Sequence, residues 1–241
     1  MSEEVVYPRK KKGDPGIGPV AVMVAMENDL ALVRRAMNIR GKAACNIMTS
    51  RLYKGTYGHQ DLSVVGPMLG GPHAVMILEK LIVMGAKKIL FLGWCGSIRK
   101  GIRIADIVVP DHAVIGEGTS AYYTPENRGS RPSRRIVRAI EESLSACAVP
   151  FHKGPVWSTD APYRETKQQI LDLQDKGVVG VDMEVSALCT AARFRHVQIG
   201  AMLVVSDELG SLDWKTGFTS SKFKRSRKKA AEVMYLTCQK L

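Results

Sequence analysis

Three acidic residues at the ends of apolar segments are the side chains of this sequence best suited to chemistry. Asp182 and Glu184 follow the apolar run 178–181, and Asp207 follows a second apolar run, 199–205. A carboxylate beside buried valines is costly unless it is paired or its pKa shifts, so such acids are usually functional or strongly hydrogen-bonded. The alternative is a structural role as helix N-cap residues, with Asp182 placed before a helix and Asp207 before a loop.

The elements around these acids follow an alternating pattern. The sequence predicts a strand at 20–25, a helix over 27–37 and a hairpin of strands 51–57 and 61–66. The turn 70–72, Gly-Gly-Pro, opens a further helix, because proline suits a first helical turn. This alternation predicts a single α/β domain with a central mixed, mostly parallel sheet flanked by helices on both faces. The carboxyl ends of parallel strands meet at one edge, where α/β proteins hold small ligands.

The second half of the chain continues the pattern. The later elements predicted are strands at 88–92 and 104–115, the latter interrupted by Pro110, a helix over 133–147, a strand near 151–158, a helix near 164–175 and a terminal helix from about 219. We expect residues 1–18 to form a basic, flexible arm and residues 19–241 to form one catalytic domain.

Composition narrows the class of protein. The chain has 241 residues, enough to bury a full core, and no apolar run reaches the length of a membrane helix. Its basic start lacks the apolar stretch of a signal peptide. The five cysteines have neither disulfide nor metal-ligand spacing, so we expect no metal site and a reducing, cytoplasmic location.

The formal net charge of +12 comes largely from the two ends of the chain. Basic residues cluster at 9–12 and again at 222–229, beside a body of mixed charge. A nucleic-acid-binding protein would interleave aromatic residues with such basic residues or carry a recognition helix. We therefore expect a small-molecule partner and no nucleic acid or membrane partner.

Two glycine-rich turns follow apolar runs, at 66–72 and 93–97. Glycine lets backbone N–H groups approach a ligand closely, and a helix N-terminus favours an anion. Ordinary turn geometry explains either turn alone equally well.

Taken together, these motifs resemble the family of purine nucleoside and uridine phosphorylases, with their relatives the methylthioadenosine/adenosylhomocysteine nucleosidases. The resemblance covers nearly the whole chain, and its combination of motifs is more specific than any single one. The matching segments are 22–30, 66–81, 93–110, 116–120, 158–160, 181–187 and 204–207.

The resemblance implies cleavage of the bond between a nucleobase and C1′ of a ribose. Met183 would pack under the sugar, and Glu184 would accept hydrogen bonds from its 2′ and 3′ hydroxyls, as an ionised carboxylate can. Ser206 and Asp207 match the purine-cleaving branches, in which the acid donates to N7 of the base and needs a raised pKa.

The base is expected to be a purine. The Gln and Arg signature of the uridine branch is not visible after the motif 158–160, where this chain has Ala161-Pro162-Tyr163-Arg164-Glu165. Trp94 and Tyr163 are candidates to stack on the base, although either could be a core residue.

The residues expected to bind the acceptor depart from the pattern of the phosphorylase branches. The phosphorylase branches hold phosphate with a Gly-Asp-Pro-x-Arg turn and a further Arg, whereas this chain has Ala25-Met26-Glu27-Asn28-Asp29 and no Arg in 89–92. Asp29 matches an acid that orients water in the nucleosidases, so water is slightly favoured. Phosphorolysis is the alternative, with Arg51, Gly96 and Ser97 as the candidate phosphate site. A non-catalytic nucleoside-binding relative is the second alternative.

The resemblance also bears on cofactors and partners. It implies no cofactor, with inorganic phosphate as co-substrate if the reaction is phosphorolysis. Active sites in the family are completed by a neighbouring chain, so a homo-oligomer, a dimer or a hexamer, is expected.

Overall fold

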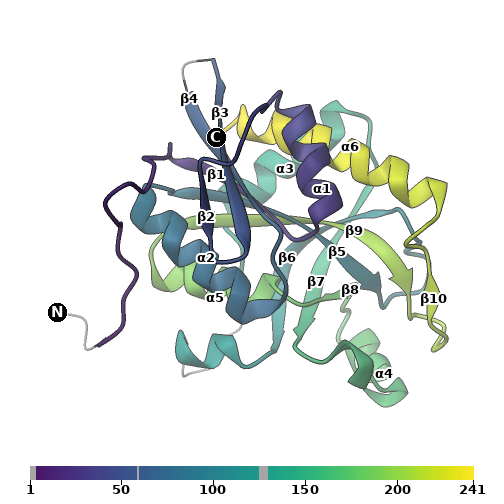
Figure 1. The fold of residues 1–241 in the computed structure, drawn as a ribbon. Coiled ribbons are helices and arrows are strands. Elements are labelled where there is room, and N and C mark those ends of the chain that lie inside the picture. The colour runs from purple at the N-terminus through teal and green to yellow at the C-terminus, as the bar shows by residue number, and fades with distance from the viewer. Residues whose placement is uncertain (1–3, 59, 125–129) are drawn as a thin grey trace.

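The computed structural model describes residues 4–58, 60–124 and 130–241, and its centre is one mixed sheet (Figure 1). The sheet order is β10-β9-β6-β7-β8-β5-β1-β4-β3-β2, and β9 also pairs with β5, so that β5, β9, β6, β7 and β8 close into a ring. The strands are β1 (Val20–Val24), β2 (Cys45–Ile47), β3 (Ser50–Tyr57), β4 (Gln60–Gly66), β5 (Lys88–Ser97), β6 (Ile107–Gly116), β7 (Phe151–Thr159), β8 (Gly180–Asp182), β9 (Gln198–Glu208) and β10 (Lys215–Thr216).

Helices cover both faces of this sheet. Helices α2 and α5 pack together on one face, and α1, α3 and α6 lie on the other (Figure 1). The helices are α1 (Glu27–Ala36), α2 (Gly70–Met84), α3 (Arg134–Ala146), α4 (Lys167–Asp175), α5 (Val185–Phe194) and α6 (Ser221–Cys238), with short 3₁₀ turns η1 (Thr119–Tyr122) and η2 (Pro162–Arg164). None of the described helices is long and apolar enough to cross a membrane.

The central strand β1 shows why the sheet is covered on both sides. Ala21 and Met23 belong to the core under α2 and α5, whereas Val20, Val22 and Val24 belong to the core under α1, α3 and α6. A strand that is apolar on both faces is typical of a parallel sheet buried between two helical layers. β1 pairs in parallel with both β4 and β5, and β5 pairs in parallel with β9.

The predicted α/β domain and its mixed sheet are confirmed, and most predicted elements are present. Strands β3 and β4 form the predicted antiparallel hairpin, whose turn includes His59, outside the described residues. Pro110 does not interrupt β6; the register with β7 shifts there instead. The helix predicted near 164–175 begins at Lys167, where Thr166 and Gln169 form a capping box.

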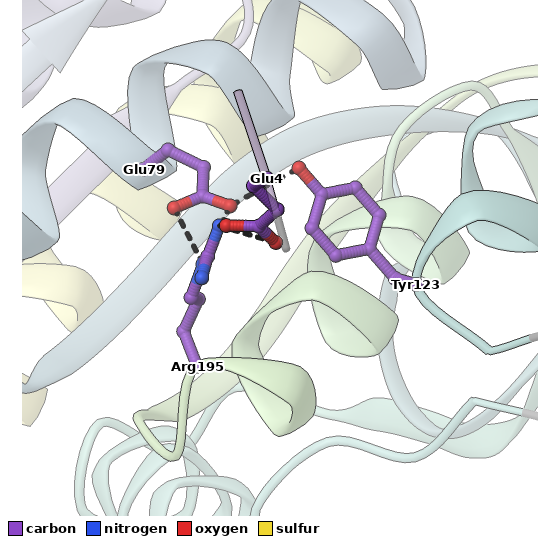
Figure 2. Close-up of polar contacts among 4 residues, drawn as sticks. All are labelled: Glu4, Glu79, Tyr123 and Arg195. Atoms are coloured by element: carbon purple, nitrogen blue, oxygen red, sulfur yellow. Dashed lines mark hydrogen bonds and ion pairs between the residues drawn. The ribbon is translucent and has the colours of Figure 1, made fainter. Parts of the chain in front are cut away.

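The described part of the N-terminal arm lies along α2 and α5. Lys80 of α2 donates to the carbonyl of Arg9 at 2.7 Å and pairs with Asp14. Nearer the N-terminus, Glu4 pairs with Arg195 at 3.4 Å, and Arg195 Nε donates to both oxygens of Glu79 at 2.8 Å (Figure 2). These contacts attach the arm at two points; its predicted flexibility stays a prediction.

Candidate functional site

A cavity of about 450 Å³ opens at the carboxyl ends of β1, β5, β8 and β9. This is the sheet edge at which the sequence places its acids. The lining residues are Ala25, Met26, Met68, Leu69, Trp94, Cys95, Gly96, Pro162, Tyr163, Glu165, Val181, Asp182, Met183, Glu184, Ser206, Asp207, Leu209, Trp214 and Phe218.

Glu184 is held in the cavity wall by the start of α2. Its Oε1 accepts from the backbone N–H of Gly70 at 2.6 Å. Gly70 has φ +77°, a conformation that only glycine adopts readily, and it belongs to the predicted Gly-rich turn 66–72. Burial, together with the negative charge of Asp182, raises the pKa of Glu184 to about 8. The backbone of α2 therefore positions the Glu184 carboxyl, and no cationic side chain on the described cavity wall offsets its negative charge.

The carboxylate of Asp182 accepts hydrogen bonds mainly from backbone N–H groups. Its Oδ2 accepts from the N–H groups of Glu184 at 3.0 Å and Val185 at 2.8 Å, and its Oδ1 accepts from Ser158 Oγ at 2.5 Å. These bonds satisfy donors at the start of α5, as the structural alternative predicted for this acid. Burial still raises the pKa of Asp182 to about 6.

Asp207 lies inside β9, which continues to Glu208, rather than in a loop after the strand. Its Oδ1 accepts from Ser206 Oγ at 2.6 Å and its Oδ2 accepts from Trp214 Nε1 at 2.8 Å. Both oxygens thus accept, which is the arrangement of an ionised carboxylate.

Glu165 is an acid of the cavity wall that the sequence analysis missed. It follows η2 directly, its side chain is partly buried, and its pKa is raised to about 7 by burial and by the charge of Asp207. One signal was available: Glu165 comes six residues after the end of β7, in the loop at the same edge of the sheet.

Asp29 and Trp94 are bonded to each other, but only Trp94 lines the cavity. Trp94 Nε1 donates to Asp29 Oδ2 at 2.5 Å, and Arg227 Nε from α6 donates to Asp29 Oδ1 at 2.5 Å. Asp29 is 1% exposed, and burial raises its pKa even beside Arg227. Both of its oxygens accept a hydrogen bond, and Asp29 does not line the cavity.

The other predicted residues divide into two groups. Met183, Gly96, Tyr163 and Ser206 lie on the cavity wall together with Trp94, Glu184 and Asp207. Ser97 is buried and donates to the carbonyl of Ile102 at 2.9 Å, and Arg51 is paired with Glu27. Neither lines the cavity, and no Lys, Arg or His does so among the residues that the structure describes.

Aromatic residues from the segment before α6 complete the wall. The rings of Trp94 and Phe218 lie 6.0 Å apart between centroids, and Trp214 contributes the donor to Asp207. Within the described ranges, no group of three His, Cys, Asp or Glu side chains is arranged to hold a metal ion.

Residues 19–238 match the sequence profile of the phosphorylase superfamily that contains purine nucleoside and uridine phosphorylases. The chain belongs to this family. Its predicted family and fold are thereby confirmed. The purine nucleoside and uridine phosphorylases of the family need no cofactor and use phosphate as co-substrate.

Individual relatives include both purine and pyrimidine enzymes. A guanosine phosphorylase of Halorubrum lacusprofundi is 26% identical over 159 residues, which cover 66% of each chain. A purine nucleoside phosphorylase structure from Toxoplasma gondii, in complex with immucillin-H, is 20% identical with a TM-score of 0.83, covering 99% of this chain and 97% of that one. A uridine phosphorylase structure from Vibrio fischeri is 22% identical with a TM-score of 0.81, covering 92% and 93%.

The two kinds of similarity support different statements. The sequence match spans slightly less than two thirds of the length of the guanosine phosphorylase. The two structural matches establish the fold over nearly the whole chain.

Proposed function

We propose that this chain cleaves the N-glycosidic bond of a nucleoside. The observation that carries the proposal is one cavity whose wall contains both Glu184 with Met183 and Asp207 with Ser206. A nucleoside has two polar parts, a ribose diol and a base edge, and two separate acidic groups suit these two parts.

The ribose is proposed to bind at Glu184. Its Oε1 already accepts from Gly70 N, so its other oxygen and remaining lone pairs are available to neighbouring hydroxyl donors. The thioether side chain of Met183 supplies an apolar surface under the sugar.

The base is proposed to be a purine that contacts the wall near Asp207. The Gln and Arg signature expected of a uridine-type site is not visible after β7, where this chain has Ala161-Pro162-Tyr163-Arg164-Glu165. Tyr163 is 91% exposed at the mouth of the cavity and has room to stack on a base.

Phosphate is proposed as the acceptor, which reverses the slight preference for water drawn from the sequence. The relatives named for an activity are phosphorylases, and this favours phosphorolysis over hydrolysis. Phosphate usually pairs with arginine forks. Hydrolysis remains the second candidate because the described cavity wall has no cationic side chain.

A homo-oligomer is proposed, with contact through an exposed apolar groove beside the arm. The groove is lined by Val6, Tyr7, Met48, Met76, Tyr122 and Phe194, next to the Glu4–Arg195 pair of Figure 2. Val6 is 90% and Tyr122 is 88% exposed. Contiguous exposed apolar surface is typical of an interface. Light scattering of Met76→Lys should then show a smaller species than the parent protein.

The test of the function is a product assay. Inosine, adenosine and uridine are each incubated with the purified protein, with and without phosphate, and free base, ribose and ribose-1-phosphate are measured. We expect release of purine base and formation of ribose-1-phosphate only when phosphate is present. Free ribose without phosphate would support the hydrolytic candidate. Absence of base release from every nucleoside, by protein of native circular dichroism, would refute the proposal.

A further inference from the structure

Two carboxyl groups line the same end of the cavity, and their surroundings differ. Asp207 accepts from Ser206 Oγ and from Trp214 Nε1, one donor for each oxygen. Glu165 is on the same wall, directly after η2, and no hydrogen bond or ion pair to its carboxyl is formed within the described residues. Donors stabilise the ionised form of a carboxyl, so the pair is unequal: Asp207 has two donors that favour its anion, and Glu165 has none among the described residues.

The charges around Glu165 reinforce this inequality. The cavity wall carries other acids, whereas two nearby cations, Arg164 in the preceding η2 and Lys215 in β10, are exposed. The titratable groups on the wall besides Glu165 are Cys95, Tyr163, Asp182, Glu184 and Asp207. Burial and the charge of Asp207 both oppose loss of the Glu165 proton, and they raise its pKa to about 7.

We propose that Glu165 supplies the proton that the leaving base takes up, while Asp207 stays ionised and fixes the base by accepting a hydrogen bond from it. This inference rests on the proposed nucleoside cleavage and changes the role predicted for Asp207, from proton donor to acceptor. A group that holds a proton near neutral pH and faces the cavity meets the requirements of a general acid.

In the proposed cleavage, one proton passes from Glu165 to the leaving base. The C1′–N bond breaks and its electron pair goes to the base, while the Glu165 O–H bond breaks and its proton forms a new N–H bond on the base. Water or hydrogen phosphate forms the new bond to C1′ and gives up one proton. That proton returns to the Glu165 carboxylate through solvent, so the enzyme ends as it began.

The inference is tested by pH–rate profiles of Glu165→Gln and Asp207→Asn on two substrates. Inosine needs its base protonated, whereas nitrophenyl riboside has a leaving group that does not. For the parent protein we expect kcat/KM on inosine to fall above about pH 7, as Glu165 loses its proton. Glu165→Gln should lose about 100-fold or more on inosine, abolish that fall, and change the riboside rate little.

Asp207→Asn should behave differently. Removing its negative charge lowers the pKa of Glu165, so the fall in kcat/KM moves to lower pH instead of disappearing. Carboxyl ¹³C NMR of the free protein provides a readout independent of turnover, in which the signal that titrates near pH 7 is missing in Glu165→Gln and shifted in Asp207→Asn. Glu232→Gln, a matched change on the exposed side of α6, should leave both profiles unchanged.

The outcomes distinguish failure of the proposed Glu165 role from failure of the proposed nucleoside cleavage. If the parent protein turns over neither substrate, the proposed function fails and the inference fails with it. If it turns over both, and Glu165→Gln keeps its rate on inosine and its high-pH fall, only the inference fails. Loss of that fall in Asp207→Asn alone would return the acid role to Asp207.

Discussion

The buried pair between Asp29 and Arg227 makes the sharpest prediction about stability and about the role of Asp29. The side chains are 1% and 8% exposed, respectively, and Arg227 Nε lies 2.5 Å from Asp29 Oδ1. Removing one partner of such a pair leaves an uncompensated buried charge, at a cost of about 3–5 kcal/mol. For a chain of this size that corresponds to a decrease in Tm of roughly 6–20 °C. We expect the decrease in Tm caused by Arg227→Met to lie in this range.

The cost of Arg227→Met should depend on pH. Burial already raises the pKa of Asp29, and loss of Arg227 removes the opposing effect, so the folded-state pKa rises further above the unfolded value. A raised carboxyl pKa gives stability at low pH that is lost as pH rises through the folded value. Urea unfolding should therefore show a larger deficit against the parent protein at pH 8 than at pH 5.

Replacing both partners with apolar residues gives the matched control. Desolvation outweighs the attraction of Arg227 at Asp29, and a buried pair in that condition can be exchanged for apolar side chains at little cost. Asp29→Leu combined with Arg227→Met should recover most of the stability lost by Arg227→Met alone. The remaining deficit comes from Trp94 Nε1, which loses its acceptor.

The same variants separate the structural role of Asp29 from the water-activating role predicted from the sequence. If the ion pair is its role, activity should follow stability, and the double variant should regain both. The reasoning is refuted if Asp29→Asn loses less than about 1 kcal/mol of stability and yet loses all turnover, because Asp29 would then be needed for chemistry.

Predictions for three further variants concern the cavity wall. Glu184→Gln weakens a charge-assisted contact worth about 1.5–3 kcal/mol, so kcat/KM should fall roughly 10- to 100-fold; unchanged kinetics would remove Glu184 from the site. Because the pKa of Glu184 is raised to about 8, its unfavourable ionisation develops as pH rises from about 4.5 to 8, so Glu184→Gln should gain stability over the parent protein across that range in urea titrations. Asp182→Asn removes the charge that helps to raise that pKa, so the acidic limb of kcat/KM should move to lower pH; an unmoved limb would contradict the coupling. Tyr163→Ala should raise KM for purine nucleosides several-fold with kcat nearly unchanged, and equal losses in both constants would argue against stacking.

Local sequence patterns predicted the elements and the acid-bearing edge of the sheet. The apolar run 199–205 became most of β9, and Gly70-Gly71-Pro72 opened α2. These features depend on residues close in sequence and on the rule that parallel strands end at one edge. The rule holds for Asp207, because β9 pairs in parallel with β5, but it does not account for Glu184, because β8 pairs antiparallel with β5. Both acids nevertheless line one cavity.

Contacts between distant segments could not be predicted in this way. Arg227 meets Asp29 across 198 positions, whereas the sequence placed Arg227 only within the basic cluster 222–229, because periodicity does not identify a partner. Trp214 and Phe218 come from an irregular segment with no period at all. Ser97, in a turn that suits a ligand, donates instead to Ile102 O, and that choice depends on the path of the next loop.

The acid-rich wall connects the acceptor with the oligomeric state. The raised pKa values of Asp182, Glu184 and Glu165 arise from burial and from neighbouring carboxylates, with no cation on the described wall to oppose them. An entering phosphate would add negative charge to this wall, whereas water would add none. Phosphorolysis by this chain therefore calls for positive charge from outside the described wall, and a second copy in the proposed homo-oligomer would be its source. Phosphate-dependent turnover should then be lost on dilution to the monomer, whereas hydrolysis confined to one chain should survive it.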